Sequence, residues 1–191
     1  MEYTLEQLFE MQKTLDAKII KEKGIEGENL LPNTVLALQV EICELANECR
    51  GFKHWSNDRE PRTHKVHQDR DAYLETNPLL EEYADCLSFF LQIANQLGLP
   101  ADDLYVNEDE LEYETSIIFT ELLHNVGLIN GHFFLLKEIA DIKEWQRQYF
   151  RSSLYIFYLL GEQRLGFTFE QIAEAYIAKN KVNHQRQANG Y

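Results

Sequence analysis

Acidic side chains at helical spacing are the residues of this sequence best suited to chemistry. Glu41, Glu44 and Glu48 lie in the otherwise apolar segment LQVEICELANECRGFKHW, residues 38–55. Residues three and four apart share one face of an α-helix, so these carboxylates form a stripe. Like charges cost an exposed helix about 0.2–0.5 kcal/mol per pair, and much more when they are buried without a counterion. A bound cation would remove this cost.

A second apolar segment, LLEEYADCLSFFLQIANQLGL, repeats the pattern with Glu82 and Asp85. Glu81 points about a hundred degrees away from Glu82, so we expect it to be solvated. If the two segments are antiparallel neighbours, Glu41, Glu44, Glu82 and Asp85 converge on one space. Hard oxygen ligands favour Mg²⁺, with Mn²⁺ as the alternative. Acidic pairs of this spacing also occur by chance, and a solvated helix face is the competing interpretation.

Other metal chemistries fit the sequence less well. A di-iron bundle needs two E-x-x-H motifs, and the chain offers one, Glu121 with His124. His64 and His67 have no cysteine nearby, so we expect them to be surface residues rather than zinc ligands.

The carboxyl-terminal segment AYIAKNKVNHQRQANGY reverses the acidic character of the chain. Lys179, Asn183 and Arg186 stand at i, i+4 and i+7, which places them on one helical face. Their side chains can donate to phosphate oxygens. Basic residues also favour helix C-termini through the helix dipole, so the pattern alone leaves both interpretations open.

The elements that must position these residues are helices. Apolar residues recur at helical spacing and period-two alternation is absent, so we read the whole chain as α-helical. We expect one domain over residues 1–191, because its composition shows no break. The predicted helices cover about residues 4–22, 34–50, 78–97, 115–127, 131–160 and 168–184.

Three helix starts carry a recognisable signature. Thr4 with Gln7, and Thr168 with Gln171, have the spacing of a capping box. Asn77 before Pro78 offers an N-cap followed by a residue whose φ is already helical.

Two polar segments interrupt the helical pattern. Residues 56–77 contain few aliphatic side chains and are predicted to be a long connection, of the kind that forms lids. Residues 102–114, DDLYVNEDELEYE, are predicted to be a solvated acidic surface.

The charge of the chain limits its partners. Eighteen basic and thirty-two acidic residues give a formal net charge of −14, which disfavours binding to nucleic acids and to anionic membranes. A polyanionic substrate would need metal ions or a local basic patch.

The cysteines and the amino terminus bear on localisation. Cys43, Cys49 and Cys86 lie among apolar residues, and we expect buried thiols in a reducing compartment rather than disulfides. The start MEYTLEQLFEMQ lacks the regions of a signal peptide, and no window reaches the roughly 18 apolar residues of a membrane span. The expected location is the cytoplasm.

Taken together, the motifs resemble the dimeric all-α dUTPases, members of the wider MazG-like nucleoside triphosphate pyrophosphatases. The similarity covers nearly the whole chain. It is carried by MQKTLDAKI, EICELANECRGFKHW, EEYADCLSFFLQIANQ and LGFTFEQIAEAYIAKNKVNHQRQANGY. The resemblance implies a multi-helix bundle that dimerises and hydrolyses dUTP to dUMP and pyrophosphate, with dUDP as a further candidate substrate.

The resemblance also implies roles for individual residues. Magnesium would be held by Glu41, Glu44, Glu82 and Asp85, and either Glu41 or Glu44 would activate the water that attacks the α-phosphorus. The residues implied to contact phosphate are Lys53, Lys179, Asn183 and Arg186. Those implied to contact the base or sugar are Gln12, Asp16, Trp55 and Phe89.

Some of these assignments have competitors. Asp16 can only accept hydrogen bonds, whereas the uracil edge also offers acceptors that need a donor. Trp55 and Phe89 fit core packing equally well. Two other functions remain open: a related pyrophosphatase for another nucleotide, and a helical interaction module without enzymatic activity.

Overall fold

The computed structural model describes residues 3–69, 72–107, 109–131 and 141–190. Within them the predicted all-α fold is confirmed, with one small β-hairpin added. The α-helices are α1 Leu5–Lys23, α2 Leu31–Cys49, α3 Pro78–Gln96, α4 Thr115–Leu128, α5 Ile142–Leu159 and α6 Phe169–Ala188. The shorter elements are β1 Lys65–Asp69, β2 Ala72–Thr76, the 3₁₀-helix η1 Ala101–Leu104 and the π-helix η2 Leu160–Arg164.

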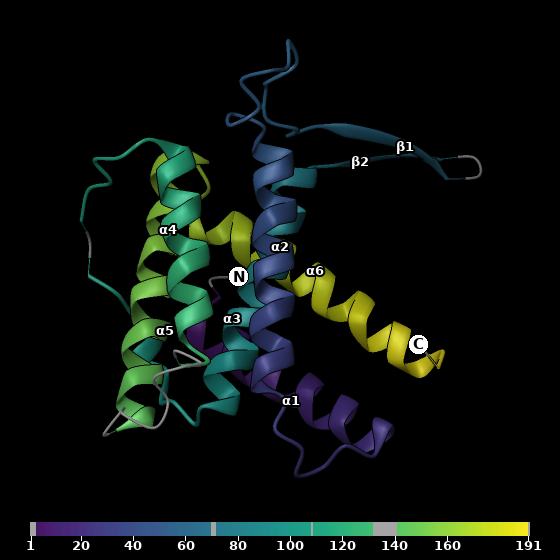
Figure 1. The fold of residues 1–191 in the computed structure, drawn as a ribbon. Helices are drawn as coiled ribbons and strands as arrows, with labels where there is room; N and C mark the ends of the chain where they lie inside the picture. Colours follow the sequence, from purple (N-terminus) through teal and green to yellow (C-terminus); the bar gives the residue numbers. More distant parts are fainter. Residues whose placement is uncertain (1–2, 70–71, 108, 132–140, 191) are drawn as a thin grey trace.

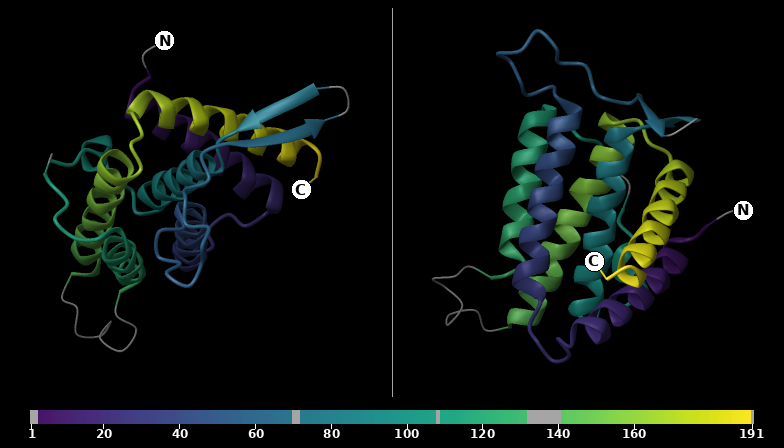
Figure 2. Two further views of the ribbon diagram at one scale, coloured as in Figure 1. Left: turned by 90° about the horizontal axis from the view of Figure 1, so that it is seen from above. Right: turned by 90° about the vertical axis from the view of Figure 1, so that its right-hand side faces the viewer.

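Four helices, α2 to α5, run alongside one another, and α1 and α6 lie side by side against α3 (Figures 1 and 2). Helix α3 therefore contacts α2 on one side and the α1–α6 pair on another. None of the helices in the described ranges combines the length and apolar character needed to cross a membrane.

The core is apolar and rich in aromatic rings. Tyr83 of α3 stacks on Phe157 of α5, with ring centroids 4.1 Å apart, and Phe90 packs against the same Phe157 at 4.8 Å. The Tyr83 hydroxyl donates to the Phe157 carbonyl oxygen over 3.0 Å, which satisfies its buried polar atom. This packing fixes α3, the helix that carries two of the predicted metal ligands.

The predicted helix starts at Thr4, Asn77 and Thr168 are confirmed, including both capping boxes. Helix α2 begins at Leu31, earlier than predicted, because Pro32 is tolerated in the first turn, where its missing amide hydrogen costs nothing. The described part of the predicted 131–160 helix begins at Ile142, and residues 132–140 lie outside the described residues.

The prediction that residues 56–77 form only a connection is wrong in its second half. Strands β1 and β2 pair antiparallel in the register Lys65↔Thr76 to Asp69↔Ala72. Both faces of this hairpin are exposed, with Val66, Tyr73 and Leu74 each at least half accessible. The apolar and polar alternation that marks a half-buried strand is therefore missing from its sequence.

The first half of the same segment is anchored to the bundle. The Arg62 amide donates to the Glu48 carbonyl over 3.0 Å, and its own carbonyl accepts from the Leu79 amide over 3.1 Å. The Arg50 guanidinium donates to the Asp58 carbonyl at 2.7 Å and pairs with the Asp58 carboxylate at 2.9 Å. The connection thus ties the end of α2 to the start of α3.

Two sequence predictions about burial are also wrong. Asp103, in the stretch expected to be solvated, is 1% exposed because its carboxylate binds Arg147 at 2.8 Å and Arg151 at 2.6 Å. Cys43 is exposed, whereas Cys49 and Cys86 are buried, and all three are free thiols. Cys43 lies about a hundred degrees around α2 from the buried Ile42, away from the core.

Gly161 in η2 allows a close approach that no other residue would permit. A Cβ atom added there would lie 2.3 Å from the Tyr83 hydroxyl oxygen, well inside van der Waals contact. The ring cannot withdraw, because it is buried and stacked on Phe157.

We therefore expect Gly161→Ala to lower the free energy of unfolding by about 1–3 kcal/mol through overpacking. Urea denaturation measures the change. Gly51→Ala is the matched control, since an added Cβ there meets nothing within 4 Å. Equal stability of the two variants would contradict the packing described for Gly161.

Candidate functional site

The two acidic helices converge as the sequence predicts. Glu41 of α2 and Glu82 and Asp85 of α3 each offer a carboxylate oxygen, and these oxygens all lie within 4.8 Å of one another. All three side chains are half-buried. Among the His, Cys, Asp and Glu side chains of the described residues, these three carboxylates form the group whose spacing suits a metal ion.

The amphipathic pattern of each helix creates this convergence. On α2, Leu38, Ile42 and Leu45 are fully buried, and Glu41 lies at the edge of their face. On α3, Tyr83 and Cys86 are buried, and the residues just before each, Glu82 and Asp85, lie at that edge. Because α2 packs against α3, the two edges meet.

Crowding the carboxylates changes their proton affinity. Burial raises the pKa of Glu41 to about 7, and the charges of Asp85 and Glu44 add to the shift. Burial likewise raises the pKa of Glu82 to about 7, with Asp85 and Glu44 contributing again. The pKa of Asp85 is also raised by burial, against the opposing hydrogen bond from Lys179. The cluster therefore favours either protons or a cation.

Glu44 and Glu48 stand beside this cluster rather than in it. Glu44 is exposed, although its charge reaches both Glu41 and Glu82. One oxygen of Glu48 pairs with Arg62 at 3.2 Å, and the other is buried without a hydrogen-bond partner among the described residues. The charge of Glu48 also raises the pKa of Glu82.

Helix α6 supplies positive charge to the cluster. The Lys179 ammonium donates a hydrogen bond to the Asp85 carboxylate and forms an ion pair with it. The charge of Arg186 lowers the pKa of Asp85, so Arg186 also lies close to the cluster. The basic face predicted from the sequence is thus directed at the acidic cluster.

A cavity of about 200 Å³ adjoins the cluster between α1, α3 and α6. It brings together five residues predicted for the site, which are Gln12, Asp85, Phe89, Asn183 and Arg186. Gln92, Ser88 and Gln187 also line it and were not predicted. Gln92 could have been found from the sequence, because it stands seven residues after Asp85 and so shares its face of α3.

Behind this cavity the structure places a buried hydrogen-bond network. Asp16, 2% exposed, accepts from Gln12 at 2.8 Å, from Asn95 at 3.0 Å and from Gln92 at 3.2 Å. The Tyr176 hydroxyl donates to the Gln12 side-chain oxygen over 3.0 Å and lies 3.1 Å from the Leu8 carbonyl. Burial raises the pKa of Asp16, and the amide donors oppose that shift. Asp16 is not among the residues that line the cavity.

Lys53 and Trp55 are among the predicted residues that do not line this cavity. Lys53 is half-buried after α2, and its ammonium lies 5.6 Å from the centroid of the Phe52 ring. Trp55 is 68% exposed, so the core-packing interpretation is wrong for this residue. Phe89 packs against the core, as the core-packing interpretation predicts, and it also lines the cavity.

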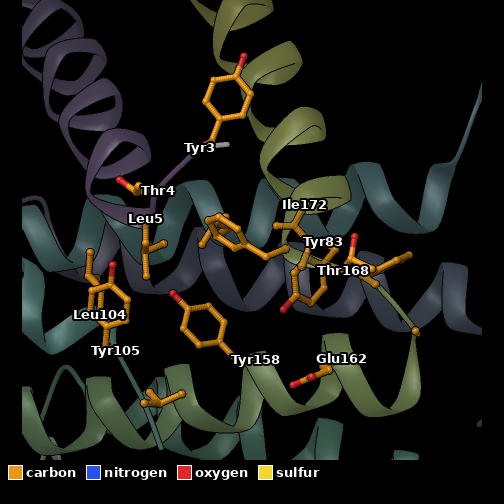
Figure 3. Close-up of a pocket in the computed structure, with 15 residues that line it drawn as sticks. Tyr3, Thr4, Leu5, Tyr83, Leu104, Tyr105, Tyr158, Glu162, Thr168 and Ile172 are labelled. Carbon is orange, nitrogen blue, oxygen red and sulfur yellow. The ribbon is translucent and has the colours of Figure 1, made fainter. Parts of the chain in front are cut away.

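A larger cavity, of about 850 Å³, lies elsewhere in the molecule, between the starts of α1 and α6, the middle of α3, η1, α5 and η2 (Figure 3). Its walls are mainly apolar and aromatic, with Tyr158 and Tyr105 among them and Glu162 at one side. Among the described residues that line it there is no Lys or Arg, and none of the predicted site residues. The described residues of the larger cavity therefore offer no Lys or Arg side chain to a phosphate group.

Comparison with known protein families identifies the group to which the chain belongs. Residues 4–191 match the family model described as dUTPase. This match over nearly the whole chain implies an all-α nucleotide hydrolase. The chain belongs to the all-α dUTPase family. Membership in this family implies a nucleotide substrate. A search of curated proteins found no match to the chain.

The raised pKa values predict how stability depends on pH without metal. The pKa of Glu41 and of Glu82 is about 7 in the folded state, against an ordinary value of 4.5. Between pH 4.5 and about pH 7, both side chains are therefore protonated in the folded protein and ionised in the unfolded chain. Stability should therefore fall as pH rises through this window. Urea denaturation in chelator across the window measures it.

Glu82→Gln should flatten the profile, because a neutral amide removes one of the titrating groups. Glu81→Gln is the matched control on the neighbouring, exposed position of α3. A wild-type profile as flat as that of Glu82→Gln would contradict the crowding described above.

Proposed function

We propose that this protein is a magnesium-dependent dUTP diphosphatase, which hydrolyses dUTP to dUMP and pyrophosphate. The observation that carries the proposal is the convergence of Glu41, Glu82 and Asp85 opposite the cationic face of α6. Family membership supports the nucleotide substrate.

The residues of the cluster fit a divalent cation. Three carboxylate oxygens within 4.8 Å of one another are hard ligands at a spacing that one ion can bridge. The pKa values of Glu41 and Glu82 are raised first by burial and then by the neighbouring carboxylates, and a cation would favour the charged form of both side chains. The unpartnered Glu48 oxygen is a further ligand atom nearby. Glu41, Glu82 and Asp85 would hold Mg²⁺, or Mn²⁺, with Glu44 completing the set. The bound ion would screen the triphosphate charge and polarise the phosphate being attacked.

The protein groups around the cluster would bind the rest of the nucleotide. Asn183 and Arg186, with Lys179, are suited to donate to phosphate oxygens. Lys53 remains a candidate for this role, as Trp55 does for contact with the base or sugar. Phe89 and Gln12, in the adjoining cavity, would contact the base.

The reaction requires one water molecule and one proton acceptor. The water oxygen bonds to the α-phosphorus, and the bond from that phosphorus to the oxygen bridging it to the β-phosphate breaks, so that pyrophosphate leaves. Glu41 or Glu44 would take the proton from the water. Because positioning and charge neutralisation dominate phosphoryl transfer, no covalent intermediate is needed.

The chain is also proposed to act as one domain, residues 1–191, in a homodimer located in the cytoplasm. The exposed face of α2 supports the dimer, because Leu36 is 62% exposed and Val40 48% exposed one turn apart. The three free thiols fit a reducing compartment.

The proposed activity predicts pyrophosphate release from dUTP with magnesium and none with excess chelator. A panel of dUTP, dTTP, dCTP and UTP separates a dUTPase from a pyrophosphatase for another nucleotide. An interaction module would release no pyrophosphate from any of them, and that result would overturn the proposal.

Glu41→Gln combined with Glu82→Gln should lower kcat at least about a hundredfold, since the site loses two anionic ligands. The same variant should lose the rise in melting temperature that Mg²⁺ alone gives the wild type. Glu81→Gln should keep both properties. Full activity in the double variant would place the reaction elsewhere in the molecule.

The proposed dimer predicts that Leu36→Glu with Val40→Glu is a monomer, because it places charge in the apolar part of the interface. Light scattering after size-exclusion chromatography measures the mass. Tyr73→Glu, in the exposed hairpin, is the control and should leave the mass unchanged. A dimer that survives the double substitution would place the interface on another face.

A further inference from the structure

Asp16 determines the orientation of the Gln12 side-chain amide. Every neighbour that hydrogen-bonds to the Asp16 carboxylate through a described side chain is an amide nitrogen, on Gln12, Gln92 and Asn95. A carboxylate accepts only, so Gln12 must turn its NH₂ group toward Asp16. Reversing the Gln12 amide would set two buried oxygens against each other at about 3 Å, which is strongly unfavourable in a site of low dielectric.

Tyr176 fixes the other end of the same amide. Its hydroxyl, fully buried, lies 3.0 Å from the Gln12 oxygen and donates to it. Gln12 is thus held at both ends by residues on its own helix and on α6. One hydrogen on the Gln12 nitrogen and one lone pair on its oxygen are then available to hydrogen-bond a ligand.

The Gln12 side chain lines the cavity of about 200 Å³ that adjoins the acidic cluster. This volume is below the roughly 300–1,000 Å³ of sites for drug-sized ligands, and it suits a single ring better than a complete nucleotide. Glu82, Asp85, Phe89 and Gln92 follow one face of α3 from the cluster into this cavity. A nucleotide with its phosphates at the cluster can therefore place its base here.

From these contacts we propose that Asp16 and Tyr176 are positioning residues that set the base specificity of the site by locking the Gln12 amide. This inference rests on the proposed function. A locked donor beside a locked acceptor matches a ring edge with a carbonyl oxygen beside a ring N–H, as in uracil. Cytosine presents the reverse order on that edge, a ring nitrogen acceptor beside an amino donor, and would need the amide turned around.

The role assigned to Asp16 differs from direct reading of the base. Asp16 is 2% exposed and its oxygens are occupied by three amide donors, so it acts on the base through Gln12. The same geometry explains why an acceptor-only side chain is compatible with a base edge that offers two acceptors of its own.

The test is the ratio of kcat/KM for dUTP to kcat/KM for dCTP, measured by pyrophosphate release with magnesium. Asp16→Asn combined with Tyr176→Phe keeps the side-chain shapes but lets the Gln12 amide adopt both orientations. We expect the ratio to fall about tenfold or more, mainly through KM, because a hydrogen-bonding site discriminates only while its groups are fixed. Both kcat/KM values scale with the concentration of folded enzyme, so partial unfolding does not alter their ratio when both substrates are measured on one sample.

A rescue variant separates positioning from general damage. Adding Asn95→Asp to Asp16→Asn places a carboxylate beside the NH₂ group of the amide introduced at position 16. That contact turns the oxygen of the introduced amide back toward Gln12, and the ratio should recover. Tyr158→Phe is the matched control, because it removes a buried hydroxyl at the larger cavity, and its ratio should equal that of the wild type. Asp16→Asn alone, measured in the same way, serves if the double variant does not fold, because it removes the acceptor that orients the Gln12 amide.

The outcomes distinguish this inference from the function on which it rests. Wild-type protein that cleaves no nucleotide overturns the proposed function. Wild-type protein that prefers dUTP, with variants that keep the same ratio within about twofold, overturns the lock and leaves the function standing. Wild-type protein that cleaves dUTP and dCTP equally also overturns the lock.

Discussion

The partial burial of three carboxylates beside one another is the constraint on which the site depends. One carboxylate oxygen each of Glu41, Glu82 and Asp85 lies within 4.8 Å of the others because the apolar faces of α2 and α3 pack together. Two of them have pKa values raised to about 7. Lys179, reaching over from α6, relieves part of the charge through its ion pair with Asp85. Burial of the core thus stabilises an arrangement that its own charges oppose.

Helix α3 connects the parts of the site. One face of this helix carries Glu82 and Asp85 at the acidic cluster, then Phe89 in the cavity, then Gln92 in the buried network around Asp16. A rise of about 1.5 Å per residue sets the spacing of these groups. The opposite face is anchored by the ring stacking of α3 on α5, so the site is built on a rigid element rather than on loops.

Much of the fold could be predicted from local patterns. The helix starts at Thr4, Asn77 and Thr168 depend on hydrogen bonds within one turn, so a few neighbouring residues suffice to predict them. The burial of Asp103 depends on distant partners, and local patterns do not predict it. Asp103 is buried because Arg147 and Arg151, more than forty residues away, bind it. The exposed hairpin carries no alternation that would reveal it.

The sequence by itself determined which carboxylates share a helix face and that an acidic chain ends in a basic segment, because helical periodicity acts over three or four residues. Only the tertiary structure decided that Glu44 stays outside the close cluster and that Asp16 is enclosed by Gln12, Gln92 and Asn95. Those relations depend on the angle and register at which α1, α3 and α6 pack. Side chains far apart in the sequence set that packing, and no local pattern records it.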